Sequence, residues 1–98
     1  MKSLRSESMD RLFEAILQLQ DLDECYRFFE DICTVKEQLD LAQRLDVAVL
    51  LSKGESYQAI SEKVNVSTAT ISRVSKYLNY GAGGYRTALA RMNEEGAK

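Results

Sequence analysis

The spacing of apolar residues along this chain is typical of helices from end to end. In the first twenty residues, apolar side chains recur three and four positions apart, which predicts one apolar stripe on a helix over about 6–20. The same spacing predicts further helices over about 22–33, 34–52, 57–64, 68–79 and 85–92, and no strand-length alternation stands out. We therefore expect an all-α subunit of six helices, with residues 93–98 frayed.

The third predicted helix differs from the others because apolar residues nearly encircle its second half. They are Leu39, Leu41, Ala42, Leu45, Val47, Ala48, Val49, Leu50 and Leu51. A helix that is apolar all round is buried all round, and a chain of 98 residues has only a small core of its own. The pattern therefore predicts a central helix flanked by a second subunit. Thr34 and Glu37 form a capping-box pattern at its start, and Gly54 is a typical stop.

The net charge is −2, but the charges are unevenly distributed. Residues 1–52 carry 6 basic and 11 acidic side chains, whereas residues 53–91 carry 6 basic and 2 acidic side chains. An acidic scaffold with a basic C-terminal half can still present a footprint for phosphates. The charge pattern is therefore compatible with nucleic acid as a partner.

Composition argues against several other classes of protein. There is no histidine, no glycine-rich phosphate loop and no nucleophile beside a candidate base, so we expect no enzyme and no catalytic residue. Cys25 and Cys33 lie on one predicted helix about 12 Å apart, too far for a disulfide, and we interpret them as small core residues. We expect no metal site and no cofactor. No apolar run is long enough for a membrane span, and the charged N-terminus has no apolar signal core, so we expect a cytoplasmic protein.

The segment 56–79 has the pattern of a helix-turn-helix, with two short helices crossing around a tight turn. Its expected inner positions form one small core, made of Ile60, Val64, Val66, Ile71, Val74 and Leu78. Asn65 lies where the chain must change direction between the two helices. Asparagine tolerates a positive φ better than other residues with a side chain. Ser61 is small enough for the two helices to touch, and Ser67 is a strong N-cap for the second helix.

The outward side of that second helix is the expected DNA-reading surface. It presents Thr68, Ala69, Ser72, Arg73 and Lys76. Short side chains permit a close approach to the major groove, while arginine and lysine reach guanine edges or phosphates. Gln58 and Ser67 are further candidates for DNA contact, because they lie near helix N-termini whose amides would face the phosphate backbone of DNA. The alternative is an ordinary helical hairpin that packs against another protein surface.

Residues 10–92 resemble the Trp repressor superfamily, and the whole chain is similar to its YerC/YecD branch of bacterial proteins. The resemblance is most specific at Ala69-Thr70-Ile71-Ser72-Arg73 and at Leu50-Leu51-Ser52-Lys53-Gly54-Glu55. It implies an intertwined homodimer with six helices in each subunit, and the six helices expected from the apolar spacing agree with it.

The resemblance also implies a ligand pocket, because Trp repressors are switched on by tryptophan held between the core and the reading head. Arg44 and Arg73 match the two arginines that sandwich the indole, and Thr34 and Thr70 match two further pocket residues. Two positions depart from the family pattern: Val74 replaces a glycine and Tyr77 replaces a serine. Both changes fill space, so we expect the pocket to be closed or to hold an amino-acid-like effector smaller than tryptophan. For Arg44 the sequence leaves open a plain ion pair with Glu37, Asp40 or Asp46.

Taken together, the sequence predicts one Trp repressor-like domain over 1–98. We expect residues 1–53 to be the dimerisation scaffold, 54–79 the helix-turn-helix and 85–93 the C-terminal helix. The expected function is sequence-specific binding of double-stranded DNA by a homodimer that regulates transcription, as a repressor. The alternative is a helical protein–protein interaction module that keeps this fold without binding DNA.

Overall fold

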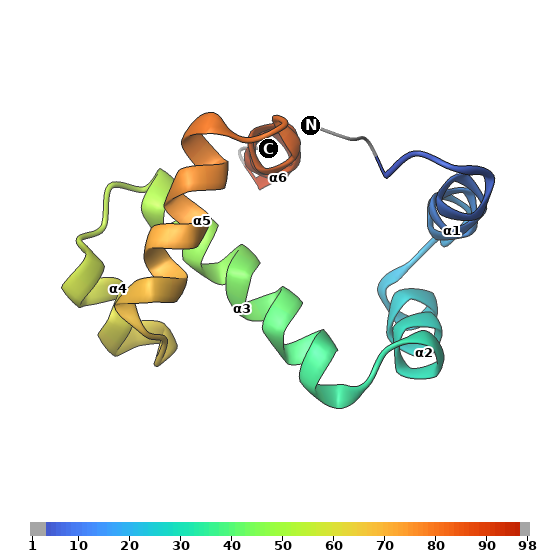
Figure 1. Cartoon of the computed structure of the whole chain (residues 1–98), viewed down its shortest axis with the longest axis horizontal. Helices are drawn as coiled ribbons and strands as arrows, with labels where there is room; N and C mark the ends of the chain where they lie inside the picture. Colours follow the sequence, from blue (N-terminus) through green and yellow to red (C-terminus); the bar gives the residue numbers. More distant parts are fainter. Residues whose placement is uncertain (1–3, 97–98) are drawn as a thin grey trace. The chain divides into compact units, whose positions relative to one another are not determined.

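The computed structural model describes residues 4–96, and within them the chain forms six helices and no strand (Figure 1). The helices are α1 (Glu7–Leu17), α2 (Leu22–Ile32), α3 (Val35–Ser52), α4 (Tyr57–Val64), α5 (Thr68–Tyr80) and α6 (Gly84–Gly96). The all-α expectation is thus confirmed. Across residues 4–96, no helix has both the length and the apolar character that a membrane crossing needs. The chain divides into two compact units, of which one ends at Gln38 and the other begins at Leu39.

Two helices have ends that differ from the sequence prediction. α1 ends at Leu17 rather than near Gln20, because Gln18 is already its C-cap and donates its amide to the Ala15 carbonyl. α6 continues to Gly96, so the expected fraying from Asn93 is wrong as far as Gly96. Two glutamates, both good helix formers, follow Asn93, and no helix breaker intervenes before Gly96. Residues 97–98 lie outside the described part of the chain.

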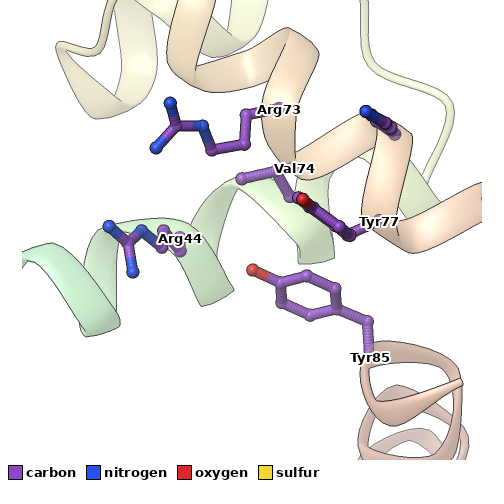
Figure 2. Close-up of a pocket in the computed structure, with 6 residues that line it drawn as sticks. Arg44, Arg73, Val74, Tyr77 and Tyr85 are labelled. Carbon is purple, nitrogen blue, oxygen red and sulfur yellow. The ribbon is translucent and has the colours of Figure 1, made fainter. Parts of the chain in front are cut away.

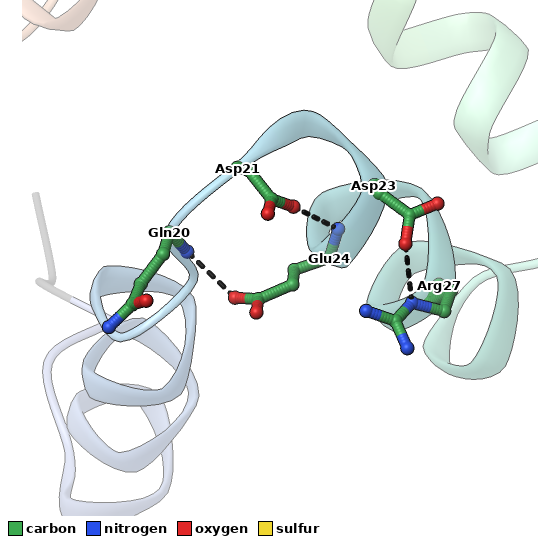
Figure 3. A network of polar contacts seen from close by, with 5 residues as sticks. All are labelled: Gln20, Asp21, Asp23, Glu24 and Arg27. Carbon is green, nitrogen blue, oxygen red and sulfur yellow. Dashed lines mark hydrogen bonds and ion pairs between the residues drawn. The ribbon is translucent and has the colours of Figure 1, made fainter.

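The link between α1 and α2 is a reciprocal cap (Figure 3). An Asp21 carboxylate oxygen accepts a hydrogen bond from the Glu24 amide at 2.8 Å, and the Glu24 carboxylate accepts one from the Gln20 amide at 2.8 Å. Asp23 and Arg27 form an exposed ion pair one turn apart at 3.1 Å. These contacts define the start of α2 and satisfy amides that a helix N-terminus leaves without a partner.

Both ends of α3 are closed by local sequence signals. The Thr34 hydroxyl accepts from the Glu37 amide at 3.1 Å, and the Glu37 carboxylate accepts from the Thr34 amide at 2.8 Å, as the capping-box pattern predicts. The backbone hydrogen bond from Thr34 holds the pKa of Glu37 below its ordinary value. At the other end, Gly54 has φ +82°, and the Glu55 amide donates to the Leu50 carbonyl at 3.1 Å. This is a Schellman ending, which depends on a left-handed residue.

The core of the C-terminal unit joins four helices. Its buried side chains are Val47, Ala48, Ile60, Val66, Ile71, Val74, Leu78 and Leu89. They include five of the six positions expected inside the helix-turn-helix, and the sixth, Val64, is partly buried against this core. In α3 only Val47 and Ala48 are buried, while Leu39 and Leu41 are exposed in the single chain. The expected burial all round α3 is therefore not met within one subunit.

The turn between α4 and α5 is built from three short side chains. Asn65 adopts φ 59° and ψ 52°, the left-handed conformation expected for it. The Ser61 hydroxyl donates to the Val66 carbonyl at 2.9 Å, which ties α4 across the turn. The Ser67 hydroxyl accepts from the Thr70 amide at 3.2 Å and begins α5. The turn therefore sets the crossing of α4 and α5.

The left-handed backbone at Asn65 generates a stability prediction. We expect Asn65→Val to lower the free energy of unfolding by about 1–2 kcal/mol, because a β-branched side chain clashes with its own backbone at positive φ. Asn65→Gly should change it by no more than about 0.5 kcal/mol, because glycine adopts this conformation without a steric cost. Urea denaturation followed by circular dichroism measures both.

The matched control is Asn93→Val, at an exposed position inside α6. Asparagine and valine have similar helix propensities, so this change should be nearly neutral. Equal losses at positions 65 and 93 would contradict the role assigned to the turn.

Candidate nucleic-acid interface

α5 has two chemically distinct sides. Ile71, Val74 and Leu78 are buried against the core, as the helical spacing predicts. The five residues expected to read DNA are all exposed: Thr68, Ala69, Ser72, Arg73 and Lys76. The packing of the apolar side therefore leaves the polar side of α5 uncovered within the subunit.

Gln58 and Ser67 lie at the beginnings of the two helices, and both are exposed. The Gln58 amide donates to the Glu62 carboxylate at 3.5 Å, a long contact one turn further along α4. The Ser67 hydroxyl is 3.2 Å from the Thr70 hydroxyl in addition to capping α5. Ser67 thus has a structural role that the sequence predicted, and both residues remain candidates for contact with DNA.

The charged side chains of α5 are all basic. No aspartate or glutamate occurs between Asn65 and Asn93. Lys63 is neutralised by Glu55 at 2.9 Å, an ion pair that ties the loop before α4 to the end of that helix. Within residues 4–96, the Arg73 side chain has no hydrogen bond or ion pair, and the Lys76 ammonium lies 5.8 Å from the centre of the Tyr77 ring. Two cations on α5 are therefore available for an anionic partner.

A cavity of about 580 Å³ lies beside α5 in the C-terminal unit (Figure 2). Its described lining consists of Arg44 from α3, Arg73, Val74, Lys76 and Tyr77 from α5, and Tyr85 from α6. Four of the six expected pocket residues thus meet in one place. Sequence reasoning missed Lys76 and Tyr85 as lining residues. Tyr85 was recognised only as part of an apolar helix face, since its position depends on how α6 packs against α5.

The other two expected pocket residues have different roles in the structure. The Thr70 hydroxyl pairs with that of Ser67, and Thr70 is not part of the described lining. Thr34 belongs to the N-terminal unit, where it caps α3. The structure does not pair Arg44 with Glu37, Asp40 or Asp46. Instead, Arg44 is exposed at the cavity wall (Figure 2).

Val74 belongs to the core and to the cavity wall at the same time, because only 2% of it is exposed although it lines the cavity. Its side chain fills space that a glycine would leave open, as the sequence comparison with the family pattern suggests. Among residues 4–96 there is no cluster of three His, Cys, Asp or Glu side chains that could hold a metal ion, and Cys25 and Cys33 are free thiols.

Comparison with known proteins gives a consistent picture. The family described as "Trp repressor protein" matches residues 7–93. The "Uncharacterized protein YerC" of Bacillus subtilis is 53% identical over 91 residues, which cover 93% of this chain and 88% of that protein. A TrpR-like protein from Eubacterium eligens has a crystal structure that superimposes with a TM-score of 0.89 at 50% identity, covering 92% of this chain and 93% of its own. The crystal structure of a putative Trp repressor from Staphylococcus aureus superimposes with a TM-score of 0.88 at 48% identity, covering 92% of this chain and 90% of its own.

The double role of Val74 leads to a prediction about stability and ligand space. We expect Val74→Gly to lower the free energy of unfolding by about 2–4 kcal/mol, because it removes a buried side chain and adds a glycine to a helix. It should also open space beside Arg73, so that binding of tryptophan becomes measurable by calorimetry.

Ser72→Gly is the matched control, because Ser72 is exposed on the same helix. It should cost only about 0.5 kcal/mol, the difference in helix propensity. A similar loss for both variants would show that Val74 does not support the core. An absence of tryptophan binding by the folded Val74→Gly variant would show that valine is not what closes the cavity.

Proposed function

The chain belongs to the Trp repressor family, and from this premise we propose that it is a homodimeric regulator, a repressor that binds specific sequences in double-stranded DNA. The helix-turn-helix of α4 and α5 is the proposed reading head. α5 enters the major groove with Thr68, Ala69 and Ser72 close to base edges, while Arg73 and Lys76 contact guanines or phosphates.

One observation supports this proposal above the others: the polar side of α5 is exposed while its apolar side is buried. In a helix-turn-helix, the recognition helix is held on one side by its own domain and enters the major groove with its other, polar side. Because no carboxylate occurs from Asn65 to Asn93, α5 itself presents only positive charges to phosphates. The similar protein named as a putative Trp repressor is compatible with the same role.

The N-terminal unit supports a homodimer. No residue between positions 4 and 38 is buried in the single chain. Leu17 and Leu22 are each 78% exposed and Tyr26 is 66% exposed, although they belong to helices with strong apolar stripes. Exposed apolar area of this extent is a feature of interaction surfaces. A second copy of the chain covers it in the proposed dimer, and two α5 helices then reach successive major grooves about one turn of DNA apart.

The same exposed surface also fits the alternative function, a protein–protein interaction module without DNA binding. Retention of the protein on heparin or duplex DNA at low salt separates the two, because only the DNA-binding protein should be retained. Selection of bound duplexes from a random pool, with and without a mixture of amino acids, then identifies the operator, its symmetry and any dependence on a ligand.

The proposed contacts predict distinct effects of two substitutions on the selected duplex. We expect Arg73→Ala to weaken binding by about 1–3 kcal/mol and to relax specificity, since arginine can read a guanine edge. Lys76→Ala should weaken binding to all sequences about equally. It should also reduce the slope of log affinity against log salt concentration by about one, because one phosphate contact is lost. Fluorescence anisotropy titrations at several salt concentrations measure both effects.

Arg91→Ala is the control, since Arg91 is an exposed arginine of α6 outside the proposed surface. It should leave the affinity almost unchanged. Unaltered affinity of both α5 variants would place the DNA surface elsewhere.

The proposed dimer predicts that Leu17→Glu produces monomers. Leu17 is exposed in the single chain, so a charge there costs the subunit little, but a dimer that covers it would have to bury that charge. Sedimentation equilibrium should show the parent as a dimer and the variant shifted strongly to monomer. Gln20→Glu, which adds the same charge at a nearby exposed position, should remain a dimer. A Leu17→Glu variant as dimeric as the parent would exclude α1 from the interface.

A further inference from the structure

A second cavity, of about 260 Å³, lies in the C-terminal unit between the last turns of α3 and α5 and the first half of α6. Its described lining consists of Leu51 and Ser52 from α3, Leu78 and Asn79 from α5, and Arg86 and Leu89 from α6. None of these residues lines the cavity beside Arg44 and Arg73, and none belongs to the proposed DNA surface. The second cavity is therefore a separate place in the fold.

One part of this cavity is apolar and is held in place by the core. Leu78 is 9% exposed and Leu89 is 6% exposed, and both belong to the buried core of the C-terminal unit. Leu51 is partly buried and packs against the same core. An aliphatic group that covers these three leucines removes apolar surface from water, which favours its binding.

The polar part of the cavity presents one guanidinium group, that of Arg86. The Asn79 amide nitrogen donates to the Ser75 carbonyl and hydroxyl at 2.9 and 3.3 Å, and the Asn79 carbonyl oxygen accepts from Arg86 Nη2 at 3.2 Å. The Ser52 hydroxyl donates to the Val49 carbonyl at 2.7 Å, so its hydrogen is already used. Within residues 4–96, Arg86 forms no ion pair with a carboxylate. Arg86 is thus oriented by Asn79 and keeps further N–H groups for an anion.

The connector between α5 and α6 fixes the geometry of this site. A Cβ atom added at Gly81 would overlap the Tyr77 carbonyl oxygen, and Gly83 has φ +91°, a conformation that favours glycine. The glycines therefore permit the tight connection that brings Arg86 and Leu89 beside the end of α5. The hydrogen bond between Arg86 and Asn79 joins the two helices across this connector.

We propose that this cavity binds a short aliphatic monocarboxylate, with its carboxylate on Arg86 and its chain on Leu51, Leu78 and Leu89. A guanidinium group matches a carboxylate through paired hydrogen bonds, and a single cation balances a single negative charge. A volume of about 260 Å³ is slightly below the range of drug-sized pockets and suits a chain of about six carbons. Because the ligand contacts three helices, it stabilises the packing of α6 on α5. The proposal does not depend on DNA binding.

The experiment titrates the isotopically labelled full-length protein with hexanoate while amide chemical shifts are followed by NMR spectroscopy. We expect saturable shifts centred on Leu51, Asn79 and Leu89. Acetate has the same charge without the chain, and hexanol has the chain without the charge. Each should bind about tenfold more weakly than hexanoate, or not measurably. An absence of saturable shifts, shifts centred on another part of the chain, or equal affinity for hexanoate and acetate would overturn the proposed site.

Three variants test the role of Arg86 in the same titration. Arg86→Gln should weaken binding of hexanoate by about tenfold or more, whereas Arg86→Lys should keep part of the affinity because it keeps the charge. Arg91→Gln removes the same charge from α6 outside the cavity and should bind as the parent does. Equal binding by Arg86→Gln and the parent would refute Arg86 as the anchor. If Arg86→Gln does not fold, the comparison of hexanoate, acetate and hexanol on the parent still decides the proposal.

Discussion

The left-handed turn at Asn65 is the constraint on which the rest of the C-terminal unit depends. It lets α4 and α5 cross closely enough for Ile60 and Ile71 to share one core, and the Ser61 hydroxyl bridges to the far side of the turn. Because α5 buries one side in that core, its polar side must face outward. The proposed reading surface is thus a consequence of how the turn is made.

α5 contributes to the cavity as well as to the proposed DNA surface. Arg73 and Lys76 lie on the outward side of α5, yet they also line the cavity whose opposite wall carries Arg44. Packing of α3 and α6 beside α5 creates this overlap.

The helices of the N-terminal unit have defined ends but no buried residue in the single chain. Its helices have well-formed caps at Asp21 and Thr34, so their ends are determined locally. Their apolar stripes nevertheless remain uncovered, and the expected burial of α3 on all sides is not reached in one subunit. Local sequence signals therefore define the ends of these helices without burying their apolar stripes in one chain.

The sequence by itself determined the six helices, the capping residues, the left-handed Asn65 and the family, because each of these depends on near neighbours or on a contiguous motif. Only the tertiary structure decided which side chains meet at the cavity. It joined Tyr85 of α6 to Arg44 of α3 and Arg73 of α5, and showed that Val74 supports the core as well as the cavity wall. The physical reason is that these contacts join helices far apart in the chain, and the packing of α3, α5 and α6 is not encoded in the periodicity of any one of them.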